Sequence, residues 1–308
     1  MTDLRTALCG SRLKNPTVLP AGILGVTAAS LARAARSGAG AVTTKSIGPE
    51  RREGHRNPVV IEVSGGLLNA VGLSCPRLDE SLDELKEAVK QSSSPVIASF
   101  YGRTVEEFAV VAERISEARP ALIEANISCP NIEEELGKPF ATDLRLAGKV
   151  TCAVKDATKI PLIVKLTPNV SDVKAIAACV EEAGADCICA INTLGPGMVI
   201  DIDSCRLVLT NKTGGLSGPA VRPIAVRCIY EIYEAVDVPL VGVGGVSSGR
   251  DVAEMLMAGA SAVGIGTAVW KEGLGVFARA CDELSRFMER NDYSKVRDLV
   301  GLAHDSSK

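Results

Sequence analysis

The stretch LVGVGGVSSGRDVAEMLMAGASAVGIGTA, residues 240–268, decides the fold. It contains two short apolar runs, at 240–243 and 262–265, separated by a segment of helical periodicity near 249–258. A glycine-rich turn follows each apolar run, and Gly259 comes just after the helical segment, where glycine adopts a helix C-cap most easily. The stretch therefore predicts a strand, a helix and a second strand parallel to the first.

The same alternation recurs along the whole chain. The other strands are expected near 17–19, 41–44, 96–99, 122–125, 162–166 and 187–191, and the other helices near 27–37, 81–91, 104–118, 142–157, 171–183, 220–235 and 274–290. Near-continuous apolar strands are typical of a parallel sheet covered on both faces. Eight such units predict an α/β fold, a (β/α)8 TIM barrel that forms a single domain over residues 1–308.

Two long segments exceed what a minimal barrel needs. Residues 46–80 separate the second strand from its helix, and residues 194–218 follow the sixth strand. Because both come after strands, we expect both over the C-terminal rim of the barrel, where long strand-to-helix loops usually carry function.

The composition argues against several classes of protein. The net charge is −3 and aromatic residues make up only 3%, which argues against a nucleic-acid partner. The sequence has neither an apolar run long enough to span a membrane nor the apolar core of a signal peptide, so we expect a cytoplasmic protein.

The ten cysteines point to a reducing compartment. Most lie in apolar stretches, as Cys179, Cys187, Cys189 and Cys228 do, and are expected to be buried free thiols. The sequence contains no Cys-x-x-Cys pair, so we expect neither an iron–sulfur cluster nor a zinc site, and no metal, in this chain.

Glycine-rich turns follow the seventh and eighth expected strands, at 242–249 and 264–268. Glycine lets backbone N–H groups approach an anion, and barrels commonly bind phosphate after these two strands. One such turn could be only a tight turn. Two of them at neighbouring strand ends favour a phosphate-bearing ligand.

Two lysines occupy unusual places. Lys45 ends the second expected strand, and Lys165 lies within the apolar fifth strand. A lysine in an apolar strand is costly unless it has a polar or charged partner. An internal ion pair would explain it, and so would a lysine that faces an anionic ligand or a reduced cofactor. Asn192 and Thr193, at the end of the sixth strand, are expected at the same rim.

The fourth expected strand runs into a loop that contains Cys129. A cysteine in a rim loop can be exposed to solvent and reactive, unlike those of the core. It could be a small packing residue. The functional interpretation is a base or nucleophile whose loop closes over the substrate.

Amide side chains recur at the expected rim, at Asn69, Asn126, Asn131 and Asn192. Each amide both donates and accepts hydrogen bonds, which suits a flat ring with alternating N–H and C=O groups. With a lysine for a carboxylate, the set fits a pyrimidine carboxylate better than a sugar phosphate.

These residues lie in motifs that resemble dihydroorotate dehydrogenase over nearly the whole chain. The motifs are TTKSI (43–47), GLLNAVGL (66–73), NISCPN (126–131), VKLTPN (164–169), INT (191–193), GGLSGPA (214–220), GVGGV (242–246) and AGASAVGIGTA (258–268). In its Cys129 and in lacking a membrane-anchoring N-terminal extension, the sequence resembles the soluble class 1 enzymes. The stretch from 166 to 220 is most similar to subclass 1B, the catalytic FMN subunit of an NAD-linked heterotetramer.

The resemblance implies an oxidoreductase with one FMN per chain that oxidises (S)-dihydroorotate to orotate in pyrimidine (UMP) biosynthesis. Cys129 would remove the C5 proton of the substrate, and hydride would pass from C6 to flavin N5. A thiol with an ordinary pKa of about 8.5 is a poor base at neutral pH. The rate should therefore rise with pH as the thiolate forms.

The resemblance also implies the remaining site residues, with Lys165 stabilising negative charge on the reduced flavin. FMN contacts are expected from Ala21, Lys45, Ser46, Ser99, Asn126, Lys165, Ile191, Gly218, Gly244, Gly245, Gly266 and Thr267. Substrate contacts are expected from Lys45, Asn69, Ala70, Val71, Gly72, Leu73, Asn126, Asn131, Asn192 and Thr193.

Two positions depart from the family pattern. Ala21 stands where a serine is usual, so only a backbone contact to FMN is expected there. Ser99 stands where an asparagine is common, and its shorter side chain would reach FMN weakly or through water.

The electron acceptor stays open between two alternatives. The resemblance to subclass 1B favours a partner subunit with FAD and a [2Fe–2S] cluster that passes electrons to NAD⁺, in a heterotetramer built on a homodimer. A class 1A-like enzyme would use fumarate instead. Three other hypotheses for the function of the chain are a flavin reductase for uracil-type rings, a non-redox barrel such as an isomerase or aldolase for a sugar phosphate, and a catalytically inactive barrel.

Overall fold

The fold was analysed in a computed structural model, which describes residues 2–128 and 140–304. Eight parallel strands form a closed barrel in the order β10-β15-β16-β3-β4-β7-β8-β9, which confirms the predicted TIM barrel. The barrel strands are β3 (Thr17–Leu19), β4 (Ala41–Thr43), β7 (Val96–Phe100), β8 (Leu122–Asn126), β9 (Leu162–Lys165), β10 (Cys187–Ala190), β15 (Leu240–Val243) and β16 (Ala262–Gly264).

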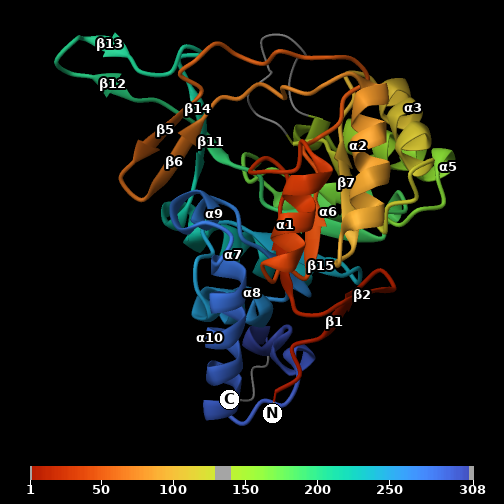
Figure 1. The fold of residues 1–308 in the computed structure, drawn as a ribbon, viewed down its shortest axis with the longest axis vertical. Coiled ribbons are helices and arrows are strands. Elements are labelled where there is room, and N and C mark those ends of the chain that lie inside the picture. The colour runs from red at the N-terminus through yellow and green to blue at the C-terminus, as the bar shows by residue number, and fades with distance from the viewer. Residues whose placement is uncertain (1, 129–139, 305–308) are drawn as a thin grey trace.

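Helices surround the barrel (Figure 1). They are α1 (Ala28–Arg36), α2 (Leu78–Gln91), α3 (Val105–Ser116), α5 (Leu144–Ala157), α6 (Val173–Glu182), α7 (Arg222–Tyr233), α8 (Gly249–Met257), α9 (Thr267–Glu272) and α10 (Val276–Arg290). The eight helices predicted from the sequence are found with their ends shifted by a few residues. The short helix α9, directly after β16, was not predicted.

Capping residues and glycines define the ends of α6 and α8. Asp172 caps α6, since its Oδ1 accepts a hydrogen bond from the Ala175 backbone N–H at 3.0 Å. After α6 and α8, Gly184 and Gly259 have φ of +99° and +119°, a region that residues with a Cβ rarely occupy. These caps turn the chain directly back into the next barrel strand.

Side chains alternate between the inside and the outside of the barrel. On β8, β9 and β10, Leu122, Ile163 and Cys187 point inward and belong to one apolar cluster within the barrel. Their neighbours Ile123, Leu162 and Ile188 belong to the larger cluster shared with the helices.

An N-terminal hairpin that the sequence did not predict closes the bottom of the barrel. It consists of β1 (Thr6–Leu8) and β2 (Ser11–Leu13), paired antiparallel. Leu8 and Leu13 are 0% and 1% exposed and pack into the inward-facing cluster. Burying each leucine contributes about 1.5–3 kcal/mol. The hairpin leaves the opposite, C-terminal rim for a ligand.

The two long segments meet over that rim, as predicted, but as a sheet and not as loops. The antiparallel sheet has the order β11-β14-β6-β5 and draws its strands from both segments. These strands are β5 (Val60–Val63), β6 (Gly66–Asn69), β11 (Leu194–Gly197) and β14 (Gly214–Ser217). A further hairpin, β12 (Ile200–Asp201) with β13 (Arg206–Leu207), projects from it, far from the two termini (Figure 1).

The cysteine predictions are confirmed in part. The nine cysteines that the structure describes are free thiols, and Cys187, Cys189 and Cys228 are buried. Cys179 is only half-buried, so the prediction that it belongs to the core was wrong. Among the helices of the described residues, none is long and apolar enough to cross a membrane.

Candidate active site

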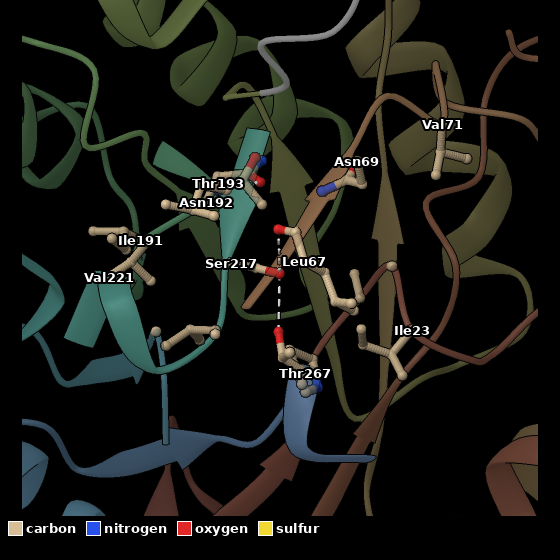
Figure 2. Close-up of a pocket in the computed structure, with 18 of the residues that line it drawn as sticks. Ile23, Leu67, Asn69, Val71, Ile191, Asn192, Thr193, Ser217, Val221 and Thr267 are labelled. Atoms are coloured by element: carbon tan, nitrogen blue, oxygen red, sulfur yellow. Dashed lines mark hydrogen bonds between the residues drawn. The ribbon is translucent and has the colours of Figure 1, made fainter. Parts of the chain in front are cut away.

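A cavity with an interior volume of about 220 Å³ lies between the barrel rim and the four-stranded sheet. Its walls come from the loops that follow barrel strands and from β5, β6 and β14. In Figure 2, Asn69 lies on one side, Asn192 and Thr193 lie on the other, and Thr267 and Ile23 lie at the far end. Polar side chains from distant parts of the sequence therefore surround a single space.

Most of the predicted site residues line this cavity. They are Ala21, Lys45, Ser46, Asn69, Val71, Gly72, Leu73, Asn126, Lys165, Ile191, Asn192, Thr193, Gly218, Gly244, Gly245, Gly266 and Thr267. Ser99 and Ala70 are fully buried and are not among the cavity-lining residues. The predicted contacts of these two residues therefore have no geometric support. Cys129 and Asn131 lie outside the described residues.

A chain of hydrogen bonds holds the end of β8 against the end of β4. Asn126 donates from Nδ2 to Ser46 Oγ at 3.2 Å, and Ser46 Oγ lies 3.0 Å from Ser99 Oγ. Ser99 is thus one step behind the cavity wall and supports Ser46. Asn126 also accepts at Oδ1 a hydrogen bond of 3.1 Å from Ser128 Oγ. The amide is fixed on both sides by these bonds, which preorganises it toward the cavity.

The end of β10 is held in a similar way. Asn169 donates from Nδ2 to the Thr193 carbonyl oxygen at 3.2 Å, and its Oδ1 accepts from the Gly195 backbone N–H at 3.0 Å. Thr193 donates its backbone N–H to Asn192 Oδ1 at 2.8 Å. Asn192 and Thr193 therefore face the cavity from a rigid turn.

The loop after β15 is shaped by a buried carboxylate. Asp251 Oδ2 accepts hydrogen bonds from the backbone N–H groups of Ser247 and Ser248, at 2.9 and 3.0 Å. Asp251 Oδ1 forms an ion pair with Arg222. Both contacts fix the path of the preceding glycines, Gly244 and Gly245, along the cavity.

Those glycines are needed where the backbone is crowded. Gly245 has φ +71°, and a Cβ added there would lie 2.7 Å from the Gly218 carbonyl oxygen. Thr267, at the start of α9, donates from Oγ1 to Ser217 Oγ at 2.9 Å and joins the barrel rim to β14 (Figure 2). This end of the cavity combines glycine backbone with hydroxyl groups, which suits a phosphate.

The loop after β6 forms the opposite end. Leu73 is a non-glycine residue at φ +54°, and its carbonyl oxygen accepts a hydrogen bond of 3.3 Å from Tyr101 Oη. Arg52 donates from Nε to the Gly72 carbonyl oxygen at 2.7 Å. These contacts place Val71, Gly72 and Leu73 on the wall beside Asn69.

Both lysines reach the cavity. Lys45 is half-buried at its edge. Lys165 is 5% exposed, and its Nζ lies 4.0 Å from Oε1 of the buried Glu124. The two explanations given for Lys165 are therefore compatible, because one side chain is both paired internally and exposed to the cavity.

Sequence reasoning missed ten residues of the cavity wall. They are Pro20, Gly22, Ile23, Val60, Leu67, Leu216, Ser217, Val221, Val243 and Trp270. Leu67, Leu216 and Ser217 lie inside quoted motifs, so the motif boundaries were a usable signal. Val60 and Trp270 gave none, because their positions depend on the unpredicted β5 and α9.

Comparisons with known proteins agree with this geometry. The sequence signature described as dihydroorotate dehydrogenase matches residues 3–288. A Methanothermobacter thermautotrophicus protein is 47% identical over 98% of this chain and 99% of its own length. Proteins of Methanosarcina mazei and Methanocaldococcus jannaschii are 49% and 45% identical, over 98% of this chain and over 96% and 98% of their own lengths.

All three relatives carry the name dihydroorotate dehydrogenase B (NAD(+)), catalytic subunit. The resemblance to subclass 1B drawn from the motifs is thereby confirmed at the level of sequence. The chain belongs to the dihydroorotate dehydrogenase family.

Proposed function

We propose that this chain oxidises (S)-dihydroorotate to orotate with bound FMN, as a step of pyrimidine biosynthesis. One observation carries the proposal: lysines, amides and a glycine-rich end lie on the walls of one cavity. The names of the relatives support the same reaction. A sugar-phosphate isomerase or aldolase would account for the glycine-rich end alone.

The chain's own residues fit FMN. Gly218, Gly244, Gly245 and Thr267 would hold its phosphate and ribityl chain, and apolar residues such as Val243 and Leu67 would contact its ring. Lys165 would face the ring with a positive charge. When bound there, FMN supplies an acceptor for the hydride that leaves C6 of the substrate.

Substrate recognition would come from charge and amide pairing. Lys45 would bind the carboxylate, and Asn69, Asn126 and Asn192 would pair with the alternating N–H and C=O groups of the ring. Cys129 follows Ser128 directly in the chain and would take the C5 proton as a general base. The hydrogen-bonded Ser128 would anchor one end of the segment that carries this base.

The electrons would leave through a partner subunit. The relatives are named as catalytic subunits of an NAD⁺-linked enzyme, and the cysteine pattern of this chain lacks the usual ligand set for an iron–sulfur cluster. We infer a partner that carries FAD and a [2Fe–2S] cluster and reduces NAD⁺.

Dihydroorotate oxidation by the purified full chain, with an artificial dye or NAD⁺ as the acceptor, tests this proposal. We expect dihydroorotate to reduce the dye briskly and NAD⁺ barely, until the partner subunit is added. Brisk NAD⁺ reduction by the chain alone would contradict the partner, and absence of dye reduction would contradict the proposed reaction.

A further inference from the structure

Glu124 is a buried acid for which the reaction described above has no use. It lies on β8 between Leu122 and Asn126, which also point into the barrel, and is 3% exposed. Leu122 belongs to the inward-facing apolar cluster of the barrel below it, and Asn126 lines the cavity above it. Glu124 therefore lies directly under the floor of the cavity.

The surroundings of Glu124 leave one of its carboxylate oxygens without a hydrogen bond. Within the described residues, its Oε1 is buried and has no hydrogen-bond partner. A buried unpaired carboxylate is strongly unfavourable, so the nearest cation must compensate for it. That cation is Lys165 on the neighbouring strand β9, whose Nζ is 4.0 Å from Oε1.

The separation of this pair is informative. Hydrogen-bonded ion pairs have N···O distances of about 2.7–2.9 Å, so the two groups attract each other without sharing a proton. Lys165 itself lines the cavity. The carboxylate thus supplies charge from below and leaves the N–H groups of Lys165 for a ligand above.

The electrostatic balance at Lys165 depends on this acid. Burial alone lowers the pKa of Lys165, but the negative charge of Glu124, with a smaller contribution from Cys189 on β10, outweighs it and raises the pKa above 10.5. Burial raises the pKa of Cys189 itself, so that side chain remains a neutral thiol. Of these two neighbours, Glu124 therefore has the larger effect on Lys165.

We propose that Glu124 is a positioning residue that acts through Lys165: its buried carboxylate keeps the lysine charged beneath the cofactor cavity. The role in catalysis rests on the proposed function, because the charge would face the flavin there. The interaction of Glu124 with Lys165 does not rest on it, since both side chains belong to the chain itself.

An NMR titration of the lysine side chains in the purified full chain tests this directly, with or without bound flavin. The signal of Lys165 is assigned by its loss in Lys165→Arg. Lys14 is an internal reference, because burial lowers its pKa and its Nζ donates to the Ala35 carbonyl oxygen at 2.7 Å, and it forms no ion pair with a carboxylate of the described residues.

In the unmodified chain, Lys165 should titrate at higher pH than Lys14, although it is more deeply buried. In Glu124→Gln the burial is uncompensated, so the midpoint of Lys165 should fall by about one pH unit or more and drop below that of Lys14. Glu124→Asp should restore the original order. Glu231→Gln, which removes a half-buried carboxylate from an ion pair with Arg227 on α7, should leave Lys165 unchanged.

A Lys165 midpoint that is the same in Glu124→Gln as in the unmodified chain would overturn the proposal. So would a midpoint below that of Lys14 in the unmodified chain, which decides the matter even if Glu124→Gln does not fold. A purely structural role would change stability without moving this titration. If the chain bound no flavin, the proposed function would fail while the titration could still succeed.

Where flavin is bound, its reduction potential gives a second readout. In Glu124→Gln the potential should acquire a new dependence on pH at the lowered midpoint of Lys165, which the unmodified chain lacks. The same potential–pH curve in both proteins would contradict the role toward the cofactor.

Discussion

Asn192 donates a hydrogen bond from Nδ2 to Ser128 Oγ at 2.9 Å. This bond joins the chain just after β10 to the chain just after β8. Ser128 is fully buried and also bonds to Asn126, so two cavity amides converge on one hydroxyl. Cys129 is the next residue in the chain. The predicted base thus directly follows the residue whose hydroxyl joins two amides of the cavity.

Replacing the predicted base should change both the rate and its pH dependence. In Cys129→Ser, turnover at neutral pH should fall by about 10²–10⁴-fold, because the hydroxyl is a far weaker acid than the thiol and supplies little conjugate base. In the unmodified chain the rate should rise with pH as the thiolate forms, and in the variant this rise should move to higher pH. Steady-state kinetics across a pH series measures both effects.

Other groups should not produce this rise. The pKa of Lys165 is raised above 10.5, so the lysine stays charged throughout the range in which a thiol near 8.5 titrates. Burial raises the pKa values of Cys187 and Cys189, which stay neutral there. A pH profile that is the same in Cys129→Ser would therefore rule out Cys129 as the base.

Lys45→Ala should impair dihydroorotate more than dihydrouracil. A hydrogen bond to a charged group contributes about 1.5–3 kcal/mol, so kcat/KM for dihydroorotate should fall by about 10–100-fold. Dihydrouracil has no carboxylate, and its weaker turnover serves as the control in the same variant. An equal effect on both substrates would instead favour a flavin reductase for uracil-type rings.

Gly245→Ala should reduce the retention of FMN. The added Cβ would lie 2.7 Å from the Gly218 carbonyl oxygen, and the backbone there has φ +71°. Gly10→Ala is the matched control, since Gly10 has φ +81° but nothing lies within 4 Å of its added Cβ, and it sits in the hairpin that closes the bottom of the barrel. Flavin absorbance per protein should drop only in Gly245→Ala. An equal loss in both variants would show that backbone strain, and not the cavity, is responsible.

Leu8→Ala should destabilise the barrel without altering the cavity. Leu8 is fully buried in the inward-facing apolar cluster of the barrel, so the substitution should lower the free energy of unfolding by about 2–5 kcal/mol. Leu207→Ala, at a residue 41% exposed on β13, should change it by no more than about 0.5 kcal/mol. Denaturant unfolding measures both, and a small effect at Leu8 would mean that the hairpin does not contribute to the core.

The barrel itself could be predicted because its signals are local. Apolar runs, helical periodicity and the glycine caps at Gly184 and Gly259 each act within a few residues. The four-stranded sheet could not be predicted, since its pairs, such as Asn69 with Gly215, join segments almost 150 residues apart. No periodicity within either segment records that partnership.

The site was predictable in its polar residues and not in its supports. Lys165 was noticed because a charge in an apolar strand is unusual, but its partner Glu124, a charge in the apolar strand expected at 122–125, was not singled out. Ser99 was expected at the cofactor; its hydroxyl lies 3.0 Å from Ser46 Oγ, and it is not among the residues that line the cavity. Whether a side chain lines the cavity or supports one that does depends on strand register, which the sequence does not reveal.

The most direct test of the central claim is to mix the purified, flavin-bearing chain with dihydroorotate in the absence of oxygen and to follow the visible absorbance of the flavin. We expect the yellow colour to bleach rapidly in the unmodified chain and at least about 100-fold more slowly in Cys129→Ser. A protein that is isolated without flavin and cannot bind FMN, or one whose bound flavin keeps its colour with dihydroorotate, would contradict the claim.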